Sequence, residues 1–243
     1  MSIAEKLKSI SEKTPKVYEA GQKLAYDEFW DDFQQKGTLT DYRYVFGGRG
    51  WTAETFHPKY DMQPTIALSM FHSTYLLSID LAEHLEKLGI SIDFSKCTDA
   101  NAVFNYGAFS RLPELNFSSA SSFTNTFRQC TNLQTIDKLI LTSNGSQTFT
   151  TPFYACTALE NIVLEGIIGK NGLSFEWSKK LSKTSIQSII SCLSSETTGL
   201  SISFSLDAVN TAFETEKGTN NGSSSDEWKT LVSSKSNWNI LLA

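Results

Sequence analysis

The sequence has few charged residues, few prolines and no long apolar run. Charged residues make up 19% of the 243, below the ~25% of a typical soluble protein. The net charge is −5, and no run of Lys or Arg exceeds two residues. We therefore expect no nucleic-acid partner, and the absence of an apolar run near ~20 residues predicts no membrane insertion. Ser and Thr fill about a quarter of the chain instead.

Targeting and metal-binding signals are also missing. Met1–Ile10 has the apolar spacing of an amphipathic helix and lacks the continuous apolar centre of a signal peptide. The sequence therefore predicts no signal peptide and a protein that stays in the cytoplasm until lysis or is virion-associated. The four cysteines form no CxxC pair, so we expect no zinc ribbon, no redox site and no cofactor.

Catalytic motifs are absent as well. The three histidines, His57, His72 and His84, show neither HxxxH nor HExxH spacing, and no nucleophile elbow, phosphate-binding loop or dinucleotide fingerprint is present. We expect no enzyme, no catalytic residue and no metal. One alternative stays open: acids such as Glu28 and Asp31, near an aromatic-rich segment, would suit a cell-wall glycan hydrolase.

The first 65 residues predict two regions. Residues 1–36 read as two N-terminal helices separated at Thr14-Pro15, because Thr caps helices and Pro suits their first turn. Their apolar spacing allows either packing on the rest of the chain or a short coiled coil, and hence a possible homo-oligomer. Residues 37–65 predict an aromatic-rich capping loop region, whose rings, Trp51 among them, would pack over the end of the adjoining repeats or stack sugars.

An internal repeat dominates the middle of the sequence. The pattern F-x-x-C-T-x-L-x-x-I runs from Phe127 to Ile136 and again from Phe153 to Ile162, displaced by 26 residues. A weaker copy aligns Tyr106 with the phenylalanine and Phe109 with the cysteine, and a still weaker one begins at Met70-Phe71.

Such short units cannot enclose a core alone, so they must stack and bury one another's apolar faces. The segments ending in Ile136 and Ile162 would be strands of a parallel sheet. Cys130 and Cys156 would lie one above the other in the stack, as buried free thiols.

Residues 181–243 predict alternating helices and strands suited to a C-terminal cap: a helix after Ser182, a strand at Leu200–Leu206, short helices, and a last strand at 238–242. The predicted fold class is therefore α+β, an α/β solenoid. It would be a short stack of parallel strands over 66–180, with N-terminal helices and a helix–strand C-terminal cap.

The repeat units resemble leucine-rich repeats of the BspA-like type. Beyond the repeats, the chain resembles proteins of gut Firmicutes and their prophages in six segments: Pro15–Gly21, Tyr26–Asp31, Gly50–Thr52, Phe56–Asp61, Ile136–Leu139 and Leu181–Lys183. The resemblance implies a leucine-rich-repeat solenoid that binds proteins or surfaces, of phage structural or surface-recognition type. It supplies no catalytic residues.

We therefore expect a non-enzymatic protein- or surface-binding protein, prophage- or phage-encoded, with a tail or host-recognition role. A bacterial cell-surface adhesin is the alternative, with the glycan hydrolase behind it. The expected partner is a protein or a cell-surface glycan. Alternation along the strands selects the candidate binding residues, to which the aromatic region adds Trp51: Thr135, Asp137, Asn161, Val163 and Glu165.

Overall fold

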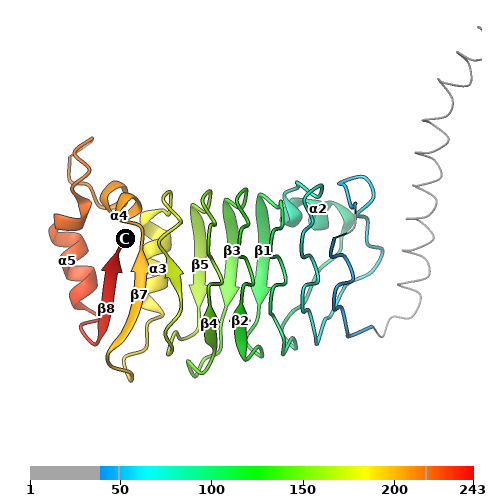
Figure 1. The fold of residues 1–243 in the computed structure, drawn as a ribbon, viewed down its shortest axis with the longest axis horizontal. Coiled ribbons are helices and arrows are strands. Elements are labelled where there is room, and N and C mark those ends of the chain that lie inside the picture. Colours follow the sequence, from blue (N-terminus) through cyan, green and yellow to red (C-terminus); the bar gives the residue numbers. More distant parts are fainter. Residues whose placement is uncertain (1–38, 49, 217) are drawn as a thin grey trace, which may run out of the picture.

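The computed structural model describes residues 39–48, 50–216 and 218–243, and these form a parallel β-solenoid of about four turns with a few helices. Figure 1 shows the strands side by side in one row, with helix α2 near one end and α4 and α5 at the other. The predicted stack of parallel strands is confirmed. The predicted helices of residues 1–36 lie outside the described residues.

Three parallel sheets organise the stack: β1-β3-β5, β2-β4 and β6-β7-β8. In chain order, the elements are α2 (Leu81–Leu88), β1 (Arg111–Asn116), β2 (Ser122–Thr124), β3 (Thr135–Ile140), β4 (Thr148–Thr150), β5 (Asn161–Glu165), β6 (Ser174–Phe175), α3 (Lys183–Ser191), β7 (Leu200–Phe204), α4 (Leu206–Ala212), η1 (Gly222–Ser224), α5 (Asp226–Ser233) and β8 (Trp238–Leu242).

A five-residue segment with phenylalanine at its centre recurs along the stack, and we call it the arch. Its first and last residues have left-handed backbone angles, with φ between 46° and 61°. The arches are Tyr44–Gly48, Ser69–Ser73, Ala102–Tyr106, Asn125–Gln129 and Thr151–Ala155.

Backbone hydrogen bonds join each arch to the next. In the fourth arch, the amides of Asn125, Phe127 and Gln129 donate to the carbonyls of Thr150, Pro152 and Tyr154 at 2.9, 2.9 and 2.7 Å. The three preceding arches repeat this pattern. Left-handed geometry costs roughly 1–2 kcal/mol for a residue other than glycine. The left-handed geometry persists here because it turns alternate amides of the arch toward the neighbouring turn of the solenoid, which we call a rung.

A column of aromatic rings runs through the core, and the arches supply its first five members. Consecutive ring centroids lie 4.7–5.9 Å apart, with interplanar angles of 4–27°. Neighbouring strands of a sheet are separated by ~4.8 Å, so rings at equivalent positions must stack. The column contains Phe46, Phe71, Phe104, Phe127, Phe153, Phe175 and Phe204.

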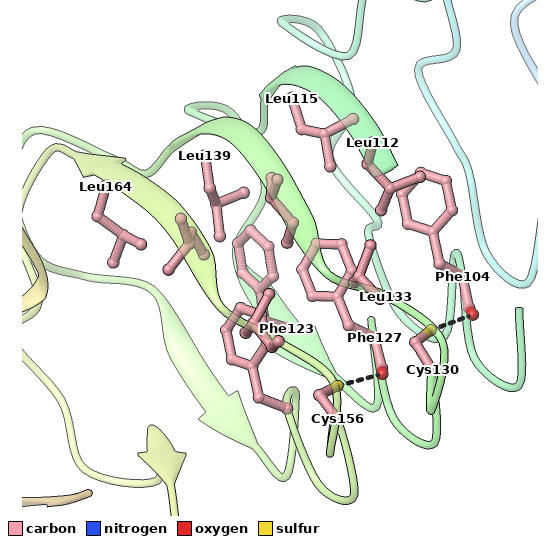
Figure 2. Close-up of a cluster of buried hydrophobic side chains, with 14 of the residues drawn as sticks. Phe104, Leu112, Leu115, Phe123, Phe127, Cys130, Leu133, Leu139, Cys156 and Leu164 are labelled. Atoms are coloured by element: carbon pink, nitrogen blue, oxygen red, sulfur yellow. Dashed lines mark hydrogen bonds between the residues drawn. The ribbon is translucent and has the colours of Figure 1, made fainter. Parts of the chain in front are cut away.

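Three residues after the arch phenylalanine, a small side chain turns inward. Cys130 Sγ donates to the Phe104 carbonyl at 2.9 Å, and Cys156 Sγ donates to the Phe127 carbonyl at 3.0 Å (Figure 2). Ser178 takes the same position after Phe175 and donates to the Cys156 carbonyl. Both thiols are buried and free, so the prediction of stacked, unbonded cysteines is confirmed.

Two predicted details of the repeat are wrong. The strands begin, rather than end, near Ile136 and Ile162, which are the second residues of β3 and β5. The weaker copy is also displaced. Leu112 pairs with Ile136, and Phe104 stacks on Phe127. Phe104 and Leu112 are one residue closer in sequence than the equivalent Phe127 and Ile136. Because of this difference, the sequence pattern aligned Tyr106 with the arch phenylalanine.

The aromatic residues of the described segment 39–64 belong mainly to the stack. Tyr44–Gly48 is itself an arch, bonded to residues 68–72. Trp51 is only 1% exposed and meets Phe46 and Phe56 edge-on, with centroids 5.8 and 6.1 Å away. Burial of these rings favours packing over the sugar-stacking interpretation of this segment.

Helices cover both edges of the β1-β3-β5 sheet. At one edge Asp80 pairs with Arg111 of β1 and caps α2, accepting from the Glu83 amide at 2.8 Å, so the chain beside β1 continues as a helix. At the other edge the hydroxyls of Ser185 and Ser188 on α3 accept from the amides of Ile162 and Leu164, each at 2.9 Å. Both edges are therefore protected from pairing with another chain.

Replacing the central ring tests the aromatic column. Phe127→Ala removes contacts with both Phe104 and Phe153, and we expect the free energy of unfolding to fall by about 3–5 kcal/mol. Tyr75→Ala, at a side chain 62% exposed, should change it by less than ~0.5 kcal/mol. Urea denaturation measures both, and similar losses in the two variants would contradict the proposed role of the column.

Candidate binding surface

The exposed side of β1-β3-β5, which we call the outer face, carries five of the six predicted binding residues. Asn161, Val163 and Glu165 are exposed on β5, and Thr135 and Asp137 are half-buried on β3. The parallel register places Thr135 beside Asn161. The structure therefore brings these five together, whereas Trp51 lies in the core and is not accessible for binding.

Two rows of ion pairs cross the outer face. In the first, Arg111 donates to both oxygens of Asp137, at 2.7 and 3.0 Å, and lies 3.7 Å from Asp80. In the second, the Lys138 ammonium lies 3.4 Å from the carboxylates of both Glu114 and Glu165. The register places Arg111 beside Asp80 and Lys138 beside Glu114. The second acid of each row lies diagonally from its cation on the next strand, so the signs alternate along each row.

The predicted acids are therefore not free to meet a ligand alone. Asp137 neutralises Arg111, and Glu165 shares Lys138 with Glu114. The hydrogen bonds of Lys138 with Glu165 and then Glu114 raise the pKa of the lysine, so this side chain stays cationic. Exposed pairs add little stability, but they fix the orientation of long side chains and reduce the entropy lost on binding.

The sequence pattern did not predict the two basic residues of these rows, Lys138 and Arg111, and the reason is geometric. Between Ile136 and Leu139, β3 holds Asp137 and Lys138, whereas β5 holds only Val163 between its buried residues, so the register shifts there. This bulge lets both β3 residues face outward, while strict alternation predicts that Lys138 points inward. Arg111 was missed because the displaced repeat copy concealed the start of β1.

An open hollow of about 410 Å³ adjoins the outer face where β3 and β5 end. Its lining includes Ser118, Thr142, Asn144 and Glu165. Glu165 is the one ionisable residue in this described lining and is the partner of Lys138. The hollow therefore offers hydroxyl and amide groups for binding and no pair of acids.

The cysteines are poor nucleophiles and metal ligands in this fold. Burial raises the pKa of the Cys97 thiol to about 11 and that of Cys130 to about 12, and it raises the pKa of Cys156 and Cys192 as well. Because the thiolate is the reactive form, these residues contribute packing. Among the described residues, no three His, Cys, Asp or Glu side chains gather into a potential metal site.

The helices give no membrane anchor in the part of the chain that the structure describes. None is both long and apolar enough to cross a bilayer.

Lys138→Gln tests the second ion-pair row. It leaves Glu114 and Glu165 without the cation between them, and we expect a lower melting temperature at low ionic strength. The difference should shrink at 1 M salt, where the screening length falls to ~3 Å. Lys229→Gln, which removes a pair at 3.7 Å on α5, is the control. If Lys138→Gln lowers the melting temperature by the same amount at low ionic strength and at 1 M salt, the electrostatic interpretation is contradicted.

The buried thiols predict a stability that falls in alkali. Unfolded cysteine ionises near pH 8.5, whereas folded Cys130 stays protonated to about pH 12. The unfolded state therefore loses protons first, and the free energy of unfolding should decrease as pH rises from about 8.5. We expect Cys130→Ala/Cys156→Ala to decline less between pH 7.5 and 9.5 than the wild type in urea denaturation. Parallel declines would refute the assignment.

Comparison with known proteins adds no relative to this geometry. No protein-family model, no curated protein and no solved structure matches the chain.

Proposed function

We propose that this chain is a non-enzymatic binding protein whose outer face contacts a protein or a cell surface. The observation that carries the proposal is the grid of side chains on β1-β3-β5. Arg111, Asp137 and Lys138 are fixed by ion pairs across three rungs, and helices cover both edges of the sheet. A partner of complementary shape and charge would bind such a surface without ordering it first.

Val163 lies at the centre of this proposed interaction. Its side chain is 50% exposed on the edge strand β5, next to the paired charges of β3. Thr135 and Asn161 pair with each other two residues before Val163 and offer a hydroxyl and an amide. An exposed apolar residue among oriented polar groups matches the composition of protein-binding surfaces, where apolar contact contributes affinity and polar contacts contribute specificity.

The resemblance to BspA-like leucine-rich repeats of gut Firmicutes and their prophages supplies the biological setting. In this proposal the solenoid is of the leucine-rich-repeat type, is encoded by a phage or prophage, and serves a tail or host-recognition assembly. The adhesin alternative uses the same outer face on a bacterial surface.

Binding to intact cells of the source bacterium tests the role of the outer face. The labelled chain should bind, and Val163→Asp should weaken binding about tenfold or more, the usual effect at a central interface residue. Leu241→Asp is the matched control, because Leu241 is also a strand residue 50% exposed and lies on β8. Equal binding by all three proteins in flow cytometry would contradict the proposal.

The location of the protein separates the phage role from the adhesin role. Immunoblots should detect the chain in virions purified after prophage induction. Detection only on cell walls of uninduced cultures would support the adhesin, and release of soluble glycan from walls by the purified chain would contradict a purely binding role.

A further inference from the structure

A second row of side chains runs along the solenoid on the arches, away from β1, β3 and β5. Its members lie one, two or four residues after the arch phenylalanines, or after Phe175, and each contacts at least one other member. We call this set the aromatic row. It consists of His72, Tyr75, Tyr106, Arg128, Tyr154 and Trp177.

The contacts within the aromatic row hold its rings at set angles. The His72 and Tyr75 rings both meet Tyr106, with centroids 6.0 and 6.3 Å away. Farther along, Tyr154 and Trp177 lie 5.1 Å apart with planes inclined by 55°. Tyr75 and Trp177 are 62% and 39% exposed. The rings of the row therefore hold one another in place, and the rings at its two ends are open to solvent.

Arg128 occupies the middle of the row and has no ionic partner among the described residues. Its guanidinium carbon lies 4.9 Å from the centroid of the Tyr154 ring, and its buried Nε meets no hydrogen-bond acceptor in the described part of the chain. The other two described arginines, Arg43 and Arg111, each pair with an aspartate. A planar guanidinium without an acid is suited to a carboxylate of a ligand, which it can bind through two parallel hydrogen bonds.

The far end of the row is fixed by a different contact. The Trp177 indole Nε1–H donates to Glu176 Oε1 at 3.0 Å. This bond positions the indole and places the Glu176 carboxylate beside Trp177. A ligand's acidic group would therefore be directed to Arg128, and an uncharged ring to Trp177.

We propose that the aromatic row binds a linear polysaccharide that carries carboxylate groups, a polymer of uronic acids. Sugar rings would lie against the exposed rings, and a carboxylate would bind Arg128. The proposal rests on the chain being a binding protein, but it uses a surface separate from the outer face.

An extended peptide is the less suitable occupant. Peptides that add to a strand need free backbone donors and acceptors. Alternate amides of the arches already donate to carbonyls of the neighbouring arches. In the Asn125–Gln129 arch the three alternate amides all bond to the next rung. The accessible surface that remains is a line of flat side chains with at least one from each turn between Phe71 and Phe175, which suits a ligand that repeats its own flat unit.

Affinity electrophoresis in gels containing polygalacturonate tests the proposal, with dextran as the neutral polymer and poly-glutamate as the acidic peptide. Polygalacturonate should retard the wild-type chain, while dextran and poly-glutamate should not. Arg128→Gln and Trp177→Ser should each weaken retardation about tenfold or more. Val163→Asp, on the outer face, should leave it unchanged.

Three results would overturn the proposal: no retardation by polygalacturonate, equal retardation by poly-glutamate, or full retardation of both row variants. Circular dichroism checks that each variant folds. If Arg128→Gln does not fold, Tyr75→Ser replaces it, because that side chain is largely exposed. Cell binding that depends on Val163, without retardation by polygalacturonate, would reject the aromatic row and retain the outer face.

Discussion

The hydrogen bonds between successive arches are the constraint on which the rest of the structure depends. Each arch directs alternate amides at the carbonyls of the next, and this fixes both the spacing and the rotation of neighbouring turns. The phenylalanine at each arch centre then has one position available, over the ring of the preceding turn. The column of rings from Phe46 to Phe153 is the consequence, and the pairing of β6 with β7 continues it to Phe175 and Phe204, with consecutive planes within 27° of parallel.

The same regularity produces the surfaces. Because equivalent positions align, any side chain that points outward from one turn has neighbours from the turns beside it. On β1-β3-β5 these neighbours alternate in charge, which turns single exposed residues into the rows through Arg111 and Lys138. On the arches the neighbours are aromatic. Regular surfaces of this kind suit the partners proposed for them, whose affinity would depend on a few anchoring contacts among many neutral ones.

The β1-β3-β5 sheet is also covered at both edges, which protects these edges from pairing with another chain. Serine side chains make this possible on α3, where Ser185 and Ser188 accept from the amides of β5 that a further strand would have used. Their hydroxyls donate back to the carbonyls of Glu160 and Leu164. The abundance of hydroxyl residues thus has a structural reason at this edge, since one hydroxyl can both accept and donate.

Sequence reasoning found the parts of the fold that repeat with fixed spacing. Phe127 and Phe153 recur with their cysteines, and the stacking of Cys130 on Cys156 followed from that. The C-terminal elements were also predicted close to their observed positions, because Ser182 caps α3 and apolar alternation marks β7. In each case the signal was local to the element.

The remaining features depended on geometry that composition does not reveal. Left-handed angles at Gln129 and Ala155 have no signal in residues that are neither glycine nor asparagine. A one-residue deletion concealed the arch at Phe104, and a bulge exposed Lys138. Trp51 was chosen for its chemistry, although its burial follows from tertiary packing. The leucine-rich-repeat type and the biological role stay predictions.

Native-state hydrogen exchange measures the central constraint most directly. The amides of Phe71, Phe104 and Phe127 each donate to the neighbouring arch at 2.7–2.9 Å, so they should exchange together, and only through cooperative opening of several turns. Exchange of these amides at the rate of the exposed loop amide of Asn220 would contradict the account.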